Sequence, residues 1–273
     1  MPTFVSVGSF DSVHLGHQAV LQKMVSAAQE ARARTAVLTF FPHPQRVIQQ
    51  LTEPYYLGTL EARIALLAQL GIDLIITHPF NETVRHTRAI TFVEELCQYL
   101  DMRQLWGGRF ALGYQREGDI PYLRRLGQEK GYLVKQVETM VMWGGERVSS
   151  SRIRRGLLEG ELAEVNGCLG RPYRVTGEVI HGQEMGHILG FPTANLDYWS
   201  EQLLPANGVY ATHAWLDGKR HLAATNVGVR PTINGAQLTV EAHLLDFEAD
   251  IYGRTLHLDF LERIRPEMKF PGL

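Results

Sequence analysis

Residues 1–148 alternate between short apolar runs and longer segments whose apolar residues recur at helical spacing, and this alternation restricts the fold more than any other feature. Short runs of Val, Leu, Ile and Phe are typical of buried strands, whereas apolar residues three and four positions apart indicate amphipathic helices. Strands that alternate with helices predict a parallel sheet with helices on both faces. The expected strands are residues 4–7, 36–40, 74–77 and 132–137, and the expected helices are residues 17–34, 60–70, 91–100 and 122–130.

The character of the sequence changes after Gly170. The runs that follow are rich in Val, Tyr, Thr and Leu, and turn-forming pairs such as Asp217-Gly218 and Asn234-Gly235 separate them. Little helix fits between these runs, so we expect an antiparallel domain closed as a small β-barrel. A chain of 273 residues is long enough for two domains. The expected domains are residues 1–155 (α/β), 156–172 (helical linker) and 173–273 (all-β), and the expected barrel strands are residues 174–181, 208–216, 221–227, 238–246 and 255–261.

The composition argues against several classes of protein. Lys and Arg are scattered and the net charge is -2 at pH 7, which is not typical of a nucleic-acid-binding surface. No apolar run approaches the length of a membrane span, and the first residues lack the basic and apolar regions of a secretory leader. Cys97 and Cys168 lie far apart, so we expect buried free thiols and a reducing compartment. These observations predict a cytoplasmic protein that binds neither nucleic acid nor membrane.

Residues 8–17 read G-S-F-D-S-V-H-L-G-H and join the first expected strand to the first expected helix. The glycines allow a tight turn, and the N–H groups of a first helical turn make such a connection an anion-binding site. His14 and His17 could donate hydrogen bonds to phosphate oxygens while charge builds up during a transfer reaction. Taken alone, the pattern leaves a nucleotide site and an ordinary helix cap both open. A zinc site is less well supported, because no nearby cluster of Cys, Asp or Glu supplies further ligands.

The same string resembles the GxFDGVHxGH signature of the nucleotidyltransferase module in bacterial bifunctional riboflavin kinase/FAD synthetases, with Ser12 where that family usually has Gly. Residues 40–44, F-F-P-H-P, resemble the family's FxPHP segment, in which two prolines hold the chain extended, although a rigid strand exit would share this pattern. Residues 147–154, R-V-S-S-S-R-I-R, resemble its R-I-S-S-T-x-I-R element, although such hydroxyls are also ordinary N-caps. The resemblance implies a Rossmann-like module that binds nucleotide through Gly8, Phe10, Asp11, His43, Arg147, Ser150, Ser151 and Arg154.

Residues 107–113, G-G-R-F-A-L-G, depart from the G-x-D-F-x-F-G loop that lines the flavin and adenine pocket in this family. Arg109 stands where an acidic or amide residue is common, and Leu112 replaces an aromatic residue. The Arg109 guanidinium could pair with a phosphate or form a surface salt bridge. The two differences at Arg109 and Leu112 therefore put in question the part of the module that would bind the flavin.

The second domain resembles riboflavin kinase in four ordered segments: G-F-P-T-A-N at 190–195, G-V-Y at 208–210, N-V-G-V-R-P-T at 226–232 and E-A-H-L-L-D-F at 241–247. Phosphoryl transfer to a flavin hydroxyl needs a ligand for Mg²⁺, donors to the phosphates and a base. The resemblance implies that Thr193 and Asn195 bind Mg²⁺ and the ATP phosphates, and that Glu241 is the base. From the residues alone, Asn195 and Asn226 are also compatible with turns, and Glu241 with an outward-facing charge.

Two features of this domain depart from the family. Residues 183–187, Q-E-M-G-H, lack the Lys or Arg that the family commonly has in the loop before G-F-P-T-A-N, which should weaken the hold on ATP phosphates. Family members also usually continue into a C-terminal helix that helps to cover the flavin, whereas this sequence stops at Leu273.

Taken together, the resemblance implies two reactions, with riboflavin, FMN and ATP as small-molecule substrates and Mg²⁺ as the metal. In the barrel, Glu241 would deprotonate the ribityl 5′-hydroxyl of riboflavin, which attacks the γ-phosphate of ATP and gives FMN. In the α/β domain, the FMN phosphate would attack the α-phosphate of a second ATP and give FAD, with His14 and His17 stabilising the developing charge. Two alternatives stay open, namely that only one module is active or that the chain is a non-catalytic regulator that binds flavin or nucleotide.

Overall fold

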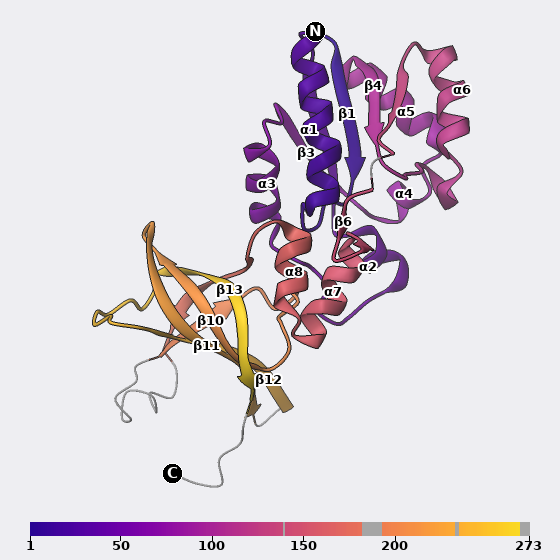
Figure 1. The fold of residues 1–273 in the computed structure, drawn as a ribbon. Coiled ribbons are helices and arrows are strands. Elements are labelled where there is room, and N and C mark those ends of the chain that lie inside the picture. The colour runs from indigo at the N-terminus through magenta and orange to yellow at the C-terminus, as the bar shows by residue number, and fades with distance from the viewer. Residues whose placement is uncertain (139, 182–192, 233–234, 268–273) are drawn as a thin grey trace. The chain divides into compact units, whose positions relative to one another are not determined.

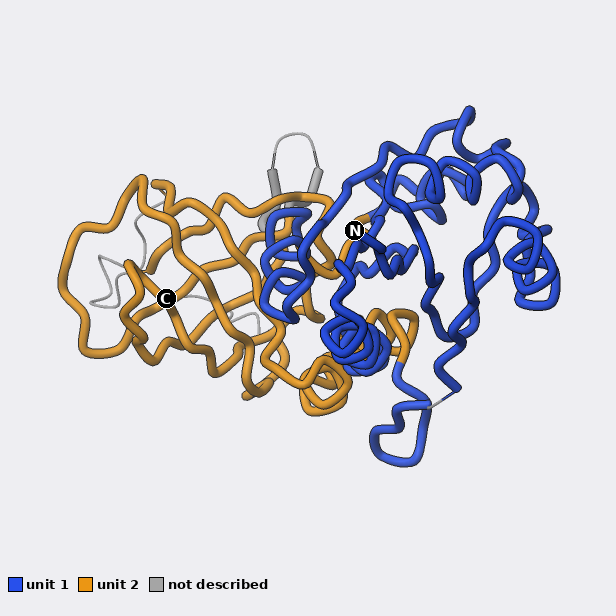
Figure 2. The backbone as a smooth tube through the Cα atoms, turned by 90° about the horizontal axis from the view of Figure 1, so that it is seen from above, with its two compact units in different colours: residues 1–53, 59–148 blue, residues 54–58, 149–273 orange. Residues whose placement is uncertain are grey.

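The computed structural model describes residues 1–138, 140–181, 193–232 and 235–267, with residues 230–232 and 235–237 described by their backbone alone (Figure 1). The chain divides into two compact units, residues 1–53 with 59–148 and residues 54–58 with 149–273 (Figure 2). The first unit contains a parallel sheet and the second a closed barrel. The predicted combination of an α/β unit with an all-β unit is therefore confirmed.

The sheet of the first unit consists of β1 (Thr3–Gly8), β2 (Arg34–Phe41), β3 (Leu74–Pro79), β4 (Met102–Gly107) and β5 (Leu133–Gln136). The strand order is β3-β2-β1-β4-β5, and β1 pairs in parallel with both β2 and β4. The chain order therefore reverses beside β1, and ligands of such sheets bind beyond the carboxyl ends of the strands at this point. β4 was not among the expected strands, because Arg103 and Gln104 interrupt its apolar run.

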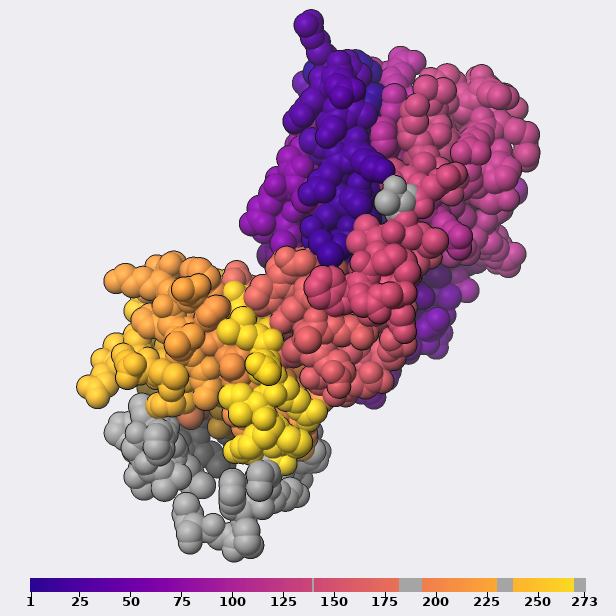
Figure 3. All heavy atoms as spheres, in the orientation of Figure 1, coloured from indigo at the N-terminus to yellow at the C-terminus, as the bar shows by residue number. Residues whose placement is uncertain are grey.

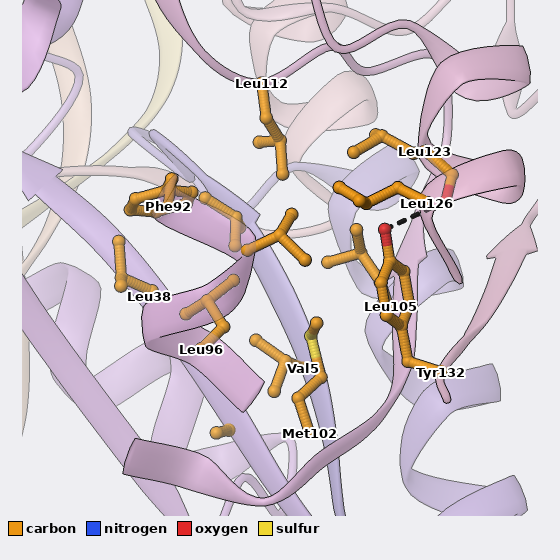
Figure 4. Packing of buried hydrophobic residues seen from close by; sticks show 13 residues of the cluster. Val5, Leu38, Phe92, Leu96, Met102, Leu105, Leu112, Leu123, Leu126 and Tyr132 are labelled. Carbon is orange, nitrogen blue, oxygen red and sulfur yellow. Dashed lines mark hydrogen bonds between the residues drawn. The ribbon is translucent and has the colours of Figure 1, made fainter. Parts of the chain in front are cut away.

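Helices cover both faces of this sheet, as the alternating sequence predicted. Neighbouring strand residues point to opposite faces, and accordingly Phe4 and Val5 of β1 belong to two separate buried clusters. The cluster around Val5 contains a hydrogen bond from the Tyr132 hydroxyl to the Leu123 carbonyl oxygen, 2.8 Å long (Figure 4). The Phe4 cluster includes residues of α1 (Leu15–Glu30) and α3 (Leu60–Gln69), and the Val5 cluster includes residues of α5 (Ala89–Leu100) and α6 (Ile120–Lys130).

Several short elements of the first unit were not predicted. Residues 144 and 145 are glycines with φ of 53° and 83°, and they join β6 (Met142–Trp143) to β7 (Glu146–Arg147) as a small hairpin. A Gly-Gly pair is a typical hairpin turn, but strands of two residues leave no periodic pattern to detect. The others are α2 (Pro44–Gln49), α4 (Glu82–Arg85) and η1 (Tyr114–Arg116).

The second unit contains α7 (Ser150–Glu159), α8 (Leu162–Leu169), β8 (Tyr173–Ile180), β9 (Ala194–Tyr198), β10 (Gly208–Leu216), β11 (Lys219–Thr232), β12 (Gly235–Leu244) and β13 (Thr255–Pro266). The strands close into a barrel in the order β10-β11-β12-β9-β8-β13, whose core includes the fully buried rings of Tyr173, Tyr210 and Phe260. Asp217 and Gly218 form the predicted turn between β10 and β11, with φ of 48° and 77°. The predicted turn at Asn234 lies outside the described residues, and β9 was not among the expected strands.

A short segment from the first half of the chain folds with the second unit. Tyr55 and Tyr56 donate backbone hydrogen bonds to the Glu201 carbonyl oxygen, at 3.0 and 3.1 Å, and the Leu203 N–H donates to the Tyr56 carbonyl oxygen at 2.8 Å. The Tyr56 side chain is fully buried, 4.7 Å from the Trp199 ring between centroids. Residues 54–58 therefore belong to the barrel unit although α2 and α3 on either side belong to the sheet unit.

Both cysteines are free thiols, as predicted, with Cys168 buried and Cys97 partly buried. Burial raises the pKa of Cys97, so this thiol is a weak nucleophile.

Of the described helices, none combines the length and apolar character needed to span a membrane. In the space-filling view, the indigo segment that includes α1 lies at the surface of the first unit, where Gln22 and Lys23 are exposed (Figure 3).

Candidate active sites

The loop between β1 and α1 has an unusual backbone. Phe10 and Val13 have φ of 43° and 42°, in the left-handed region that side chains disfavour, and most of all β-branched ones. Both side chains are buried, and the Val13 N–H donates to the Phe10 carbonyl oxygen at 3.2 Å. Ser12, which replaces the usual Gly, is not among the positive-φ residues, so its side chain adds no strain of this kind. Strained loops of this type cluster at functional sites.

His14 is the N-cap of α1. Its Nδ1 atom accepts a hydrogen bond from the His17 N–H at 3.2 Å, so a neutral His14 ring carries its proton on Nε2. A side chain at Gly16 would place its Cβ 3.1 Å from this ring, which explains the Gly of the His-x-Gly-His pattern. The two imidazoles lie together at the start of α1, as predicted. Their rings stack with centroids 3.7 Å apart and an interplanar angle of 12°.

His17 is held in its neutral form. Burial, followed by the nearby charges of His14 and Arg63, lowers the pKa of His17 well below its ordinary value. Its Nδ1 atom is buried and has no hydrogen-bond partner in the described part of the chain. The Phe10 and His17 rings lie in a T-shaped arrangement with centroids 5.2 Å apart. A buried polar atom without a partner costs about 1–3 kcal/mol and calls for a functional explanation.

A buried ion pair supports this loop from behind. The Arg63 Nη2 atom lies 3.4 Å from the Asp11 Oδ1 atom, and both side chains are fully buried. Arg63 also donates from Nη1 to the Thr39 hydroxyl at 3.1 Å and to the Phe40 carbonyl oxygen at 3.0 Å. Arg63 was not among the predicted site residues, although the sequence contains a signal for it. It lies three residues after Leu60 and four before Leu67, on the apolar stripe of α3.

His43 and Gly8 lie where the sequence predicted. His43 has φ of -64° and ψ of 132°, an extended conformation, and it caps α2 with Nδ1 accepting from the Gln45 N–H at 3.1 Å. A neutral His43 ring therefore also carries its proton on Nε2. Gly8 ends β1, and a Cβ there would lie 3.1 Å from the Phe10 ring.

The loop at residues 107–113 depends on its glycines. A Cβ at Gly107 would lie 2.3 Å from the Phe110 ring, and a Cβ at Gly113, which has φ of 78°, would lie 2.4 Å from the Ala89 nitrogen. Leu112, which stands where the family usually has an aromatic residue, is buried in the core. Arg109 is exposed, and within the described residues it forms no ion pair, so the predicted alternative of a surface salt bridge is not observed.

The hydroxyls at the start of α7 divide into different roles. Ser149 is the N-cap, and its Oγ atom accepts from the Arg152 N–H at 3.3 Å. Ser150 and Ser151 are the first residues of the helix itself, and neither of them is the N-cap. Arg147 is exposed in β7. The N-cap interpretation therefore explains Ser149 but not its two neighbours.

Arg154 is oriented by the segment that folds with the second unit. Its guanidinium carbon lies 3.7 Å from the centre of the Tyr55 ring, and its Nε donates to the Tyr55 carbonyl oxygen at 2.8 Å. Stacking and a hydrogen bond fix the plane of a guanidinium group, which suits recognition of phosphate.

The second site lies on adjacent strands of the barrel. Glu241 of β12 stands directly opposite Asn195 of β9 on one side and Asn226 of β11 on the other. Directly opposed residues share one face, with Cβ atoms about 4.5–5.5 Å apart. Their strand neighbours, such as Val240 and Ala242, are buried, so the row lies on the outer face of the barrel. Both asparagines lie within strands, which excludes the alternative of turn residues.

Hard oxygen donors are present for a divalent cation. Thr193, directly before β9, offers a hydroxyl, and Asn195 offers an amide oxygen. Among the described residues no cluster of three or more His, Cys, Asp and Glu side chains could hold a metal ion by itself. This donor set fits Mg²⁺ bound mainly through nucleotide phosphates and water, which is how proteins commonly hold that ion. Residues 183–187 and 190–192 lie outside the described residues.

Comparison with known proteins covers both units. A family model described as FAD synthetase matches residues 1–152, and one described as riboflavin kinase matches residues 169–273. Bifunctional riboflavin kinase/FMN adenylyltransferases from Haemophilus influenzae and Listeria monocytogenes are 36% and 35% identical to this chain, covering 98% of it and 87% and 86% of their own lengths. A crystal structure from Streptococcus pneumoniae, described as a macrolide-efflux protein, has a TM-score of 0.89 and 27% identity, covering 100% of this chain and 89% of its own. By sequence and by fold, this chain belongs to the bifunctional riboflavin kinase/FMN adenylyltransferase family.

Proposed function

We propose that this protein makes flavin cofactors in two ATP-dependent steps, phosphorylating riboflavin to FMN in the barrel unit and adenylylating FMN to FAD in the sheet unit. The observation on which the proposal rests most directly is the stacked pair His14 and His17 at the N-terminus of α1, beyond the carboxyl end of the central strand. Such a position suits phosphate groups, since helix N-termini attract anions. The family relationship of both units supports the same conclusion.

In the adenylyl transfer step, an oxygen of the FMN phosphate attacks the α-phosphorus of ATP. A new P–O bond forms, the bond to the bridging oxygen breaks, and pyrophosphate leaves. The FMN phosphate is already anionic, so no side chain needs to act as base. A neutral imidazole still has an N–H to donate, and we assign His14 and His17 to the phosphoryl oxygens on which charge builds up.

Further residues are assigned to the nucleotide of this step. We assign Ser150, Ser151 and Arg154 to its phosphates, because the two serines are the first residues of α7 and Tyr55 orients the arginine. Arg147 adds a second exposed guanidinium. Gly8, Phe10 and His43 are also assigned to the nucleotide, whereas Asp11 is buried and paired with Arg63, so we assign it to the support of the loop.

In the kinase step, Glu241 accepts the proton of the ribityl 5′-hydroxyl while that oxygen attacks the γ-phosphorus of ATP and ADP leaves. The carboxylate is partly exposed on the barrel surface, between two amide side chains in register. Asn195 and Thr193 are assigned to the phosphates and to Mg²⁺. When bound, that ion would neutralise part of the phosphate charge.

Incubation with MgATP and either riboflavin or FMN, followed by chromatography of the flavins, tests both steps. FMN from riboflavin and FAD from FMN are expected. FAD from FMN alone would restrict the activity to the sheet unit, and FMN without FAD would restrict it to the barrel. Tight flavin binding without any product would instead support a non-catalytic regulator.

A further inference from the structure

We propose that Arg63 is a positioning residue for adenylyl transfer, because it holds residues 9–13 in the backbone conformation that presents His14 and His17. This inference rests on the proposed function of the sheet unit. Arg63 is 1% exposed as a residue, and its side chain is fully buried. It therefore acts on the reaction through the loop and not by touching the substrate.

Arg63 reaches the loop by two routes on either side of Phe10. The direct route is the ion pair with Asp11, whose atoms lie 3.4 Å apart. The second route passes through Thr39, whose hydroxyl receives a hydrogen bond from Arg63 at 3.1 Å and donates one to the Ser9 carbonyl oxygen at 2.9 Å. Arg63 thus fixes the residue before Phe10 and the residue after it.

The backbone between these two points needs such support. Phe10 and Val13 have positive φ, and strained residues of this kind persist only where the surroundings over-determine them. Val13 directly precedes His14, and its carbonyl oxygen accepts a hydrogen bond from Gln18 in α1 at 2.8 Å. A relaxed loop would therefore move the cap of α1 and with it the stacked imidazoles.

The positive charge of Arg63 supports the site as its hydrogen bonds do, because it acts on the protonation of His17. His17 is faced by His14 in the same turn, by the Phe10 ring and, from α3, by the Arg63 charge. A positive charge beside a buried imidazole favours its neutral form. The neutral form is the one that keeps His17 a hydrogen-bond donor without burying another cation.

Steady-state kinetics of FAD formation test the proposal in three variants. Arg63→Met removes the charge and the hydrogen bonds, and we expect kcat to fall about 100-fold with little change in KM for ATP or FMN, since small displacements of catalytic groups have effects of this size. Arg63→Lys keeps the charge and should recover part of the rate. Thr39→Val breaks only the route to Ser9 and should lower kcat less than Arg63→Met does.

NMR titration of His17, assigned by comparison with His17→Ala, provides a readout that loss of stability alone would not change. The pKa of His17 should rise in folded Arg63→Met and stay at the wild-type value in Thr39→Val. Arg174→Met is a control for the loss of a paired guanidinium elsewhere in the chain, because Arg174 pairs with Asp259 at 2.6 Å in the barrel unit. This control should leave both kcat for FAD formation and the His17 titration unchanged.

A folded Arg63→Met protein with wild-type kcat and an unchanged His17 titration would overturn the proposal. If that variant does not fold, wild-type kcat in both Arg63→Lys and Thr39→Val would overturn it equally. Failure of the proposed function is a separate result. Wild-type protein would then make no FAD from FMN, while the titration of His17 in the variants would still report on the loop.

Discussion

The two candidate sites of this molecule are built in opposite ways. In the sheet unit, the histidines stand at the end of a loop with two strained residues, Phe10 and Val13, and the polar contacts behind it are buried. In the barrel, Glu241 meets its neighbours through the ordinary register of adjacent strands. A loop site depends on residues that never touch the substrate, whereas a site on regular strands depends mainly on its own side chains. Substitutions at each site can test this contrast.

The largest effect is expected at Glu241. Gln has the same shape and keeps the strand register, but it cannot accept a proton, so Glu241→Gln should reduce FMN formation from riboflavin by up to about 10⁴-fold. Riboflavin binding, measured by fluorescence titration, should be retained, and FAD formation from FMN should be unaffected. Glu178→Gln is a matched control on the exposed face of β8. Wild-type kinase activity in Glu241→Gln would remove this residue from the mechanism.

The next effect is expected at His17. Replacement by Ala removes a donor aimed at the developing charge, and it should lower the rate of FAD formation by about 10²–10³-fold while leaving riboflavin phosphorylation intact. Chromatography of the flavins formed in both reactions by the same enzyme preparation gives the ratio of FAD formation to riboflavin phosphorylation. His86→Ala, which removes an exposed imidazole next to α4, is the control. Adenylyl transfer at the wild-type rate in His17→Ala would contradict the assigned role.

A smaller effect is expected on stability, and it tests how strongly the sheet unit depends on backbone packing. Gly113 and Gly131 share φ of 78°, but an added Cβ meets the Ala89 nitrogen at 2.4 Å in the first case and no atom within 4 Å in the second. Both substitutions by Ala carry the cost of a positive φ, which therefore cancels in the comparison. Gly113→Ala should be about 1–3 kcal/mol less stable than Gly131→Ala in urea unfolding. Equal stabilities would show that the loop moves freely away from α5.

The contrast between a loop site and a site on regular strands also determines which parts of the molecule could be predicted from the sequence. Hydrophobic periodicity identifies the parallel sheet and the barrel, and the resemblance to known motifs locates His14, His17 and Glu241. Register is a non-local property, so nothing in the sequence alone placed Asn195 and Asn226 on either side of Glu241.

Some of the unpredicted features leave a pattern in the sequence, and others do not. β9 alternates apolar and polar residues over Ala194–Tyr198 and could have been recognised as a strand. Arg63 appears in the sequence as one charge on an apolar helical stripe, and its partners Asp11 and Thr39 come from distant segments. The groups that support a strained loop are therefore the part of a site that sequence patterns conceal most.

The smallest effect is a pH dependence of stability that comes from His17 in the sheet unit. The pKa of His17 is lowered in the folded protein, mainly by burial, from an ordinary value of 6.5. Below pH 6.5 the unfolded chain therefore binds a proton that folded His17 does not, so this contribution to stability is complete above pH 6.5 and is lost as the pH falls toward the folded pKa. Urea unfolding between pH 7.5 and 5.5 should show the wild type losing stability more steeply than His17→Gln, by a slope approaching about 1.4 kcal/mol per pH unit. Parallel slopes would mean that His17 titrates normally in the folded chain, and the loop would then not hold this imidazole in its neutral form.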